Sequence, residues 1–311
     1  MKAARFGTIH RAGRSGPGHH FSELCSGHRH GQSTVSKSHG EPMQTMAARR
    51  MVEKPWGKTD IGLFGSKPST QPTAIGEVWF EPAGSDVLVK YLFTSERLSV
   101  QVHPDDEQAR AMHAVRGKEE CWLILEADPG AEYGIGLTRE VSRDELRAAA
   151  LDGTIIDLVD WHPARVGDFI YNPARTVHAL GAGLTVLEVQ QNSDTTLRLF
   201  DYFSARPLHV EEAVAISRRG PHHHRLDTHV DFSATRILVD GPKFGLAVCN
   251  GRAPTLPSNA TDFQLVTWRD AVTIDGQPVP PGSMVRLNNP DQIRTSGNQQ
   301  FFLVWAVKPP S

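Results

Sequence analysis

Val87-Leu-Val-Lys-Tyr-Leu-Phe93 and Leu98-Ser-Val-Gln-Val-His103 are two short stretches of β-branched, aromatic or alternating apolar residues. Runs of the same kind recur at residues 121–125, 186–190, 244–248, 263–268, 271–274 and 301–307. Glycine, proline, asparagine and aspartate stand between them, which is typical of short β-strands joined by turns. This spacing predicts a mainly β fold, either a sandwich or a barrel.

A few short helices are expected among the strands. Ser142-Arg-Asp-Glu145 matches a capping box, and the following residues up to Leu151 continue a helix from it. A second helix is expected over residues 210–217. The acidic run at residues 105–107 is interpreted as a solvated helix start, because acidic side chains favour the first turn.

The first fifty residues differ in composition from the rest of the chain. They hold eight Lys and Arg against two Asp and Glu, whereas the remaining residues hold 25 against 33. They are rich in glycine, serine and histidine and have no apolar periodicity, so we expect residues 1–50 to be a disordered N-terminal extension. Met43, Met46 or Met51 is then a candidate for the true translation start. Two β domains are expected over residues 51–217 and 234–311, with a linker over 218–233.

Composition narrows the class of protein. The chain has 311 residues, 39% of them hydrophobic, which suits about two globular domains. Its longest apolar runs fall short of the roughly 20 residues that span a bilayer, so no membrane association is expected. Three distant cysteines argue against a disulfide scaffold and favour a cytoplasmic location. The acidic body gives little support to nucleic-acid binding.

Three segments place metal-ligating residue types on strand-like backgrounds. Alternation along residues 98–103 puts Ser99, Gln101 and His103 on one face. Lys118 and Glu120 share a face of the strand that begins near residue 118, and a tight turn from Gly167 leads to a strand that ends in His178. Taken together, the metal-ligating types are two imidazoles, one carboxylate and one amide oxygen, at Gln101, His103, Glu120 and His178. That set suits Zn²⁺ or another borderline divalent ion.

The order of these segments is similar to the cupin pattern, and more closely resembles the type I mannose-6-phosphate isomerase family. The second cupin motif matches Gly167-x5-Pro173-x-Arg175-x2-His178. Six family motifs follow one another between residues 52 and 217: Glu53-Lys-Pro-Trp-Gly57, Leu98-Ser-Val-Gln-Val-His-Pro-Asp-Asp106, Gly117-Lys-Glu-Glu-Cys-Trp122, Thr176-Val-His-Ala-Leu180, Leu187-Glu-Val-Gln-Gln-Asn-Ser-Asp-Thr-Thr-Leu-Arg198 and Leu208-His-Val-Glu-Glu212.

The resemblance implies two cupin-like, jelly-roll β-barrels, of which residues 51–217 form the catalytic one and residues 234–311 a degenerate one. It implies one Zn²⁺ per chain, held by Gln101, His103, Glu120 and His178. The family pattern carries catalytic roles over to Lys118, Glu188 and Arg198. It carries phosphate binding to Ser99, with Arg198 as a further contact.

The sequence departs from the family pattern in the turn before His178, where Arg175 replaces a glycine. The expected backbone conformation costs a non-glycine residue about 1 kcal/mol, so Arg175 is either mildly strained or useful near an anionic substrate. A further cation that many relatives carry is missing near residue 201, unless Arg206 replaces it.

The resemblance implies an aldose–ketose isomerase that interconverts mannose 6-phosphate and fructose 6-phosphate through an enediol. A metal next to Lys118 is expected to lower the pKa of this lysine, which favours a role as a proton shuttle. The planar guanidinium of Arg198 suits a phosphate or enediolate, although a salt bridge with Asp194 or Asp201 is the simpler interpretation.

Three alternative functions stay open: an isomerase of another sugar phosphate, a metal-dependent cupin dioxygenase, and a non-catalytic sugar-binding cupin. The partner is expected to be a small sugar phosphate, and the chain a monomer or weak homodimer.

Overall fold

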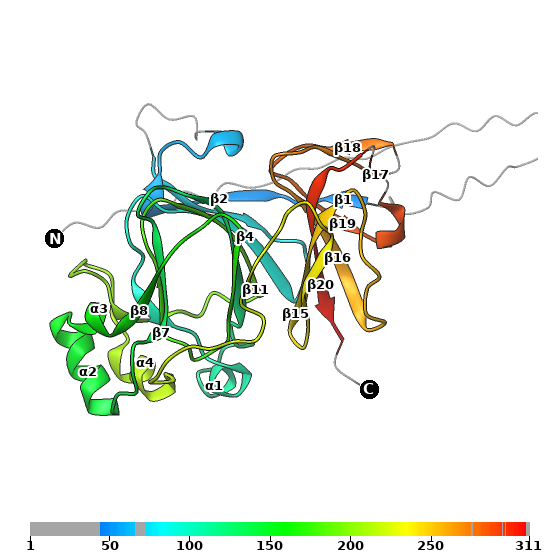
Figure 1. Ribbon diagram of the computed structural model, residues 1–311. Coiled ribbons are helices and arrows are strands. Elements are labelled where there is room, and N and C mark those ends of the chain that lie inside the picture. The colour runs from blue at the N-terminus through cyan, green and yellow to red at the C-terminus, as the bar shows by residue number, and fades with distance from the viewer. Residues whose placement is uncertain (1–43, 66–72, 275, 294, 296, 309–311) are drawn as a thin grey trace, which may run out of the picture. The chain divides into compact units, whose positions relative to one another are not determined.

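The computed structural model describes residues 44–308 except 66–72, 275, 294 and 296, and its strands far outnumber its helices (Figure 1). The predicted mainly β fold with a few short helices is confirmed. Four α-helices and two 3-10 helices occur in the described part: α1 (Asp106–Ala111), α2 (Arg143–Asp152), α3 (Ile155–Leu158), α4 (Val210–Ile216), η1 (Gly62–Phe64) and η2 (Pro290–Gln292). None of these helices is long and apolar enough to cross a membrane.

Two antiparallel sheets form the first part of the fold. The seven-stranded sheet has the order β13 (Thr228–His229), β9 (Asp168–Asn172), β6 (Glu120–Ala127), β11 (Leu184–Gln191), β4 (Val87–Phe93), β3 (Ile75–Phe80) and β2 (Arg49–Lys58). The five-stranded sheet has the order β12 (Leu197–Phe200), β5 (Val100–Val102), β10 (His178–Leu180), β7 (Glu132–Leu137) and β8 (Val159–Pro163). One hydrophobic cluster contains Leu92 and Trp122 of the first sheet and Ile135 and Leu180 of the second, so the two sheets face each other.

A third sheet forms the C-terminal part. Its order is β1 (Gln44–Met46), β19 (Met284–Leu287), β16 (Ala260–Thr267), β20 (Gln300–Val307), β15 (Phe244–Asn250) and β14 (Arg236–Asp240), and β17 (Val272–Ile274) and β18 (Gln277–Val279) form a separate hairpin. Residues of this sheet, such as Leu246 and Val304, share a buried cluster with Val89 and Leu187 of the seven-stranded sheet. The C-terminal sheet therefore packs on the outer face of the seven-stranded sheet.

The outer face of the five-stranded sheet is covered by helices. Leu146 of α2 and Val214 of α4 are buried in one cluster with Val100 of β5 and Leu199 of β12. The Ser142 side chain accepts a hydrogen bond from the Glu145 amide at the start of α2, which is one of the two bonds of the predicted capping box, while the Glu145 carboxylate pairs with Arg139. Both predicted helices are thus present, and each buries its apolar side on the sheet.

Strand β4 shows how one strand serves two layers. Its residues alternate between the two faces. Tyr91 lies in the cluster shared with the C-terminal sheet, while Leu92 lies in the cluster between the first two sheets. Because both faces are covered, the strand is apolar almost throughout, and Lys90 is the exception that points to the same side as Leu92.

The structure differs from the expected boundaries in two places. Residues 1–43 of the expected extension lie outside the described residues, but β1 pairs with β19 and β2 begins at Arg49, so residues 44–50 are folded. A strand joins a sheet edge through backbone hydrogen bonds, which need no apolar pattern. The expected linker 218–233 contains β13, which pairs with β9, and the buried Val230.

Candidate active site

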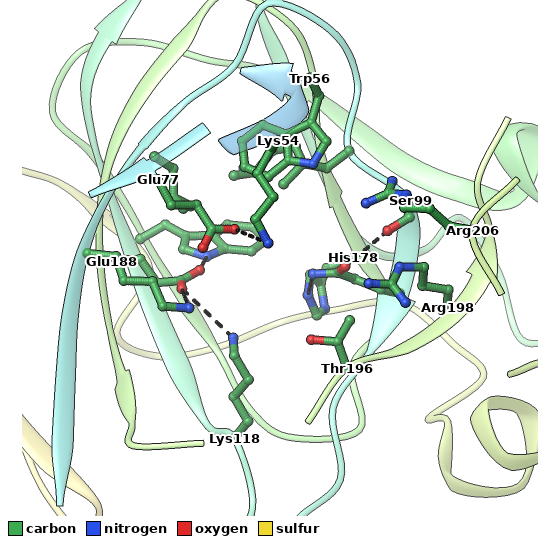
Figure 2. Close-up of a pocket in the computed structure, with 16 residues that line it drawn as sticks. Lys54, Trp56, Glu77, Ser99, Lys118, His178, Glu188, Thr196, Arg198 and Arg206 are labelled. Atoms are coloured by element: carbon green, nitrogen blue, oxygen red, sulfur yellow. Dashed lines mark hydrogen bonds and ion pairs between the residues drawn. The ribbon is translucent and has the colours of Figure 1, made fainter. Parts of the chain in front are cut away.

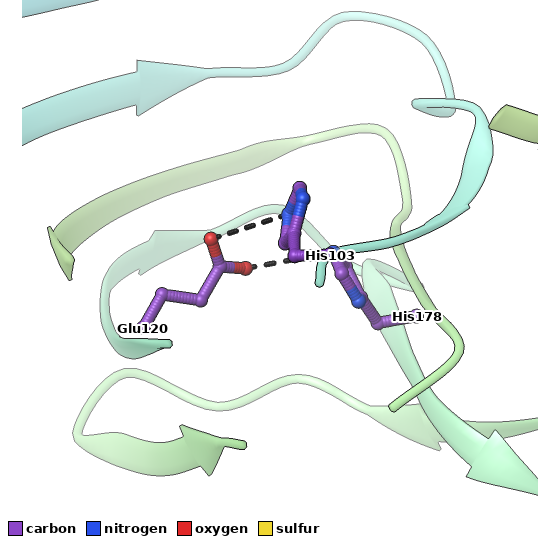
Figure 3. A group of neighbouring side chains, drawn as sticks. All are labelled: His103, Glu120 and His178. Atoms are coloured by element: carbon purple, nitrogen blue, oxygen red, sulfur yellow. Dashed lines mark ion pairs between the residues drawn. The ribbon is translucent and has the colours of Figure 1, made fainter. Parts of the chain in front are cut away.

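Three buried side chains converge at one end of the space between the first two sheets. His103 follows β5, Glu120 opens β6 and His178 opens β10, and their ligand atoms all lie within 4.8 Å of one another (Figure 3). The pairing of His178 with Gln101 across β10 and β5 brings the two histidine segments together. Each of the three side chains is at most 1% exposed.

The two imidazoles are oriented by the backbone. Nδ1 of His103 lies 2.9 Å from the Thr195 carbonyl oxygen, and Nδ1 of His178 lies 2.9 Å from the Thr176 carbonyl oxygen. Nδ1 therefore donates in both rings, which leaves each Nε2 as a lone-pair donor. Burial lowers the pKa of both histidines, so neutral imidazole is the favoured form.

The carboxylate lies close enough to both imidazoles for one metal ion to bind all three side chains. Glu120 Oε2 lies 3.4 Å from His103 Nε2, and Glu120 Oε1 lies 3.5 Å from His178 Nε2. Burial would raise the pKa of Glu120, but the charge of the Lys118 ammonium and its bond to the carboxylate oppose burial, and the pKa is lowered, so the carboxylate is charged. Two neutral imidazoles and one carboxylate suit a borderline divalent cation.

Gln101 lies beside this triad. Its Nε2 is 3.3 Å from His178 Nε2, and its Oε1 accepts a hydrogen bond from Ser99 Oγ at 3.1 Å. A half-turn of the amide exchanges the two atoms and brings Oε1 to the triad, where it has the right chemistry for a fourth ligand. The predicted ligands Gln101, His103, Glu120 and His178 are thus adjacent in the structure.

A cavity opens beside the triad (Figure 2). In Figure 2, Glu77, Lys118 and Glu188 lie on one side of His178, and Ser99 and the two arginines lie on the other. The lining is mostly polar and comprises Lys54, Trp56, Glu77, Lys90, Leu92, Leu98, Ser99, Gln101, Lys118, Trp122, His178, Leu180, Glu188, Thr196, Arg198 and Arg206.

The two arginines of the cavity differ in their partners. Arg206 binds both carboxylate oxygens of Asp201, with Nε at 2.7 Å from Oδ2. Arg198 has no ion pair in the part of the chain that the structure describes, and its buried Nε has no hydrogen-bond partner there. Burial lowers the pKa of Arg198, and Arg206 acts in the same direction. The salt bridge considered for Arg198 is absent because Asp201 pairs with Arg206, which leaves Arg198 available for an anion.

Glu188 and Lys118 form the opposite side of the cavity. Glu188 accepts a hydrogen bond from Trp122 Nε1 at 3.2 Å, and its other oxygen lies 3.2 Å from Lys90 Nζ and 3.8 Å from Lys118 Nζ. Lys118 Nζ also contacts Glu120 and lies 3.2 Å from His103 Nε2. A buried lysine therefore bridges the triad and Glu188.

The direction of the Lys118 pKa differs from the expectation for a lysine beside a metal ion. Burial lowers the pKa of Lys118, but the charges of Glu120 and Glu188 outweigh burial and raise it in the protein alone. The Lys118 ammonium and a metal ion at the triad would both interact with the Glu120 carboxylate. A cation held by the triad would therefore weaken the effect of this carboxylate on Lys118.

Several cavity residues received no role from the sequence. Lys54 lies 3.1 Å from Glu77, and Lys90 pairs with Glu188 while its Nζ lies 4.2 Å from the Trp79 ring centroid. The signal that could have found them is a charged residue inside an apolar strand, since Lys90 and Glu77 interrupt two otherwise apolar runs. A charge in such a position needs a partner or a function.

Arg175 takes the conformation that its position in the turn predicts. Its φ is +75°, in the left-handed region. Its amide donates to the His103 carbonyl at 2.7 Å, and its Nε donates to the Ile216 carbonyl at 3.0 Å. The side chain is not part of the cavity lining, so of the two readings the structure favours mild strain that supports the turn.

Comparison with known proteins gives relatives of one kind. The chain is 36% identical over 166 residues to "Mannose-6-phosphate isomerase" of Streptococcus mutans, covering 51% of this chain and 52% of that protein. It is 37% identical over 157 residues to "Mannose-6-phosphate isomerase ManA" of Bacillus subtilis, covering 45% of this chain and 49% of that protein. The matches thus span about half the length of these curated relatives. No family model matches the chain.

The fold is shared with solved structures. The crystal structure of the mannose 6-phosphate isomerase from Bacillus subtilis superposes with a TM-score of 0.68 at 25% identity, covering 85% of this chain and 99% of the other. A putative mannosephosphate isomerase from Archaeoglobus fulgidus has the same fold, with a TM-score of 0.64 at 17% identity. The resemblance that the six motifs predicted is confirmed, as is the fold class.

Proposed function

We propose that the protein is a zinc-dependent mannose-6-phosphate isomerase that interconverts mannose 6-phosphate and fructose 6-phosphate. The observation that carries this proposal is the cavity itself. It joins a buried His/Glu/His triad to an arginine without an ion pair among the described residues on one side, and to a buried Lys–Glu pair on the other. The names of the similar proteins support the same reaction.

The arginine side of the cavity suits an anionic group of the substrate. Arg198 offers a planar guanidinium whose buried Nε bonds to no described residue, and the Ser99 hydroxyl lies on the same side. Arg206 reaches the same region but already holds Asp201. We therefore assign the phosphate to Arg198 and Ser99 first, and to Arg206 as an outer contact.

Gln101, His103, Glu120 and His178 would hold one Zn²⁺ per chain. When bound, the ion supplies a Lewis acid that polarises a sugar oxygen. With one carboxylate among four ligands, the site keeps a net positive charge, which favours the developing enediolate.

The Lys–Glu side of the cavity performs the proton transfer. Isomerisation removes a proton from C2 of the aldose and returns one to C1, and it moves a proton between the two neighbouring oxygens. Glu188 is oriented by Trp122 and Lys90 and acts as the base for the carbon-bound proton. Lys118 lies between Glu188 and the triad and shuttles the proton between the oxygens.

A coupled isomerase assay on purified protein tests the proposal. We expect turnover of mannose 6-phosphate that exceeds turnover of glucose 6-phosphate, that disappears on chelation and that returns with zinc. The free phosphate-binding side and the charged lining argue against a dioxygenase, which an oxygen-consumption assay checks in parallel. Absence of turnover with every sugar phosphate, in protein shown by elemental analysis to hold zinc, would refute the proposal.

A further inference from the structure

Asp106, the first residue of α1, joins the catalytic sheets to the C-terminal sheet. Its Oδ2 lies 2.5 Å from Nζ of Lys243, which stands between β14 and β15 of the C-terminal sheet. Its Oδ1 accepts hydrogen bonds from the Gly117 amide at 2.8 Å and from Gln191 Nε2 at 2.9 Å. This one carboxylate thus forms an ion pair with one segment and accepts hydrogen bonds from two others.

The segment that Asp106 holds carries two residues of the proposed active site. Gly117 directly precedes Lys118 and lies three residues before Glu120. The Lys118 amide donates to the Pro104 carbonyl at 3.0 Å, and the Glu119 amide donates to Gln191 Oε1 at 3.0 Å. The side chain of Gln191 is therefore held by Asp106 at its nitrogen and holds the Glu119 amide with its oxygen.

The fit between this segment and α1 is close. A Cβ on Gly117 would lie 2.6 Å from the Asp105 carbonyl carbon and 2.7 Å from the Asp106 nitrogen. The backbone of Gly117 is therefore packed directly against the backbone at the start of α1, so a displacement of α1 would also displace Gly117. A small shift of Asp106 is thereby passed to Lys118, whose ammonium must stay between Glu120 and Glu188.

We propose that Lys243 is a positioning residue for the reaction: through Asp106 it fixes the segment 117–120 that presents Lys118 and Glu120. The C-terminal sheet thus contributes to catalysis without placing a residue in the cavity. This inference rests on the proposed function for its kinetic consequence, but the contact network can be tested without any activity.

The charge of the carboxylate agrees with this role. Partial burial alone would raise the pKa of Asp106, but the bonds from Lys243, the Gly117 amide and Gln191 outweigh it and lower the pKa to about 2. Asp106 is therefore ionised throughout the physiological range. The interpretation of residues 105–107 as a merely solvated helix start holds for Asp105, whose side chain caps α1, but not for Asp106.

The decisive variant is Lys243→Met, which keeps an unbranched side chain of similar length and removes its charge. Arg269→Met is the matched control, because Arg269 also joins the C-terminal part to the seven-stranded sheet, through Glu126 at 2.6 Å. Glu126 lies near the far end of β6 from Glu120. Lys243→Arg restores the charge and serves as the conservative rescue.

Two measurements decide between positioning and a general loosening. By hydrogen exchange, we expect the Gly117 amide of Lys243→Met to lose about tenfold or more of its protection, while Arg269→Met keeps it. By kinetics, we expect Lys243→Met to lower kcat about tenfold with KM little changed, because the phosphate side of the cavity is untouched. Lys243→Arg should recover most of both, and Asp106→Asn combined with Lys243→Met should lose no more kcat than Asp106→Asn alone.

Equal exchange at Gly117 in Lys243→Met and wild type would overturn the inference, as would equal losses of kcat in Lys243→Met and Arg269→Met. If the wild-type protein has no isomerase activity, the proposed function fails, and the exchange of Gly117 still tests the contact. Loss of Gly117 protection with unchanged kcat would show that the bond exists but has no positioning role, which also overturns it.

Discussion

Two buried regions lie on opposite faces of the seven-stranded sheet, and they are built by opposite rules. On β11, Glu188 points into the cavity, while its neighbours Leu187 and Val189 are buried against the C-terminal sheet. The cavity side holds several buried charges and a guanidinium nitrogen that has no hydrogen-bond partner in the part of the chain that the structure describes. The other side is an apolar core. Adjacent residues of one strand thus serve different purposes, because successive side chains point to opposite faces.

The charged cavity and the apolar core are expected to contribute differently to function and to stability. Burying charge is unfavourable unless partners compensate for it, so the cavity lining adds little to the free energy of unfolding. The apolar core between the sheets stabilises the fold through the surface it removes from water. Substitutions on the two faces should therefore affect different measurements.

The largest effect is expected in the cavity, from Arg198→Ala. The variant should lose about 10²- to 10³-fold in kcat/KM, as removal of a single transition-state donor typically does. Its free energy of unfolding should stay within about 0.5 kcal/mol of wild type, because among the described residues the buried Nε has no bond to lose. Steady-state kinetics and urea unfolding of the same preparation measure both. Near-normal turnover would remove Arg198 from the mechanism.

Much of this architecture could be predicted from the sequence, because alternation reports the face of a strand. The limits of β4 were predicted to the residue from its apolar run, and the cap at Ser142 located α2. The motif order grouped Gln101, His103, Glu120 and His178, which the structure brings together.

The sequence could not supply what depends on the pairing of distant segments. Lys54 and Glu77 meet because β2 pairs with β3, and nothing in either strand specifies this register. Likewise, β1 joins a sheet edge more than 230 positions away in the sequence, and Lys243 reaches Asp106 across two layers. Periodicity shows which face a residue occupies but not which residue it meets.

The second effect is expected in the apolar core, from Leu187→Ala. Leu187 is fully buried next to Glu188 in the sequence but on the opposite face. The variant should lose about 2–5 kcal/mol in the free energy of unfolding, from lost burial and the cavity left behind. Its kcat per folded molecule should stay within about threefold of wild type, since the cavity lining keeps its contacts. A tenfold loss of kcat at full folding would break the comparison, because the two faces would then be coupled.

The smallest effect is expected at Asp106, which links the segment before Lys118 to Lys243 of the C-terminal part. It should appear as a pH dependence of the free energy of unfolding. The folded-state pKa of about 2 lies below the ordinary value of 3.8, so Asp106 stabilises the fold above about pH 4, and this contribution is lost as the pH falls towards 2. After allowance for partial exposure, the contribution is about 1–2 kcal/mol. Asp106→Asn cannot lose a charge, so its free energy of unfolding should fall less than that of wild type between pH 5 and pH 2.5. Urea unfolding at both pH values gives the two slopes, and the difference cancels the other carboxylates that titrate in both proteins. Parallel slopes would mean that the carboxylate is not held in the folded state, and the link between the first two sheets and the C-terminal sheet would then depend on the apolar contacts and on other polar contacts such as Arg269–Glu126.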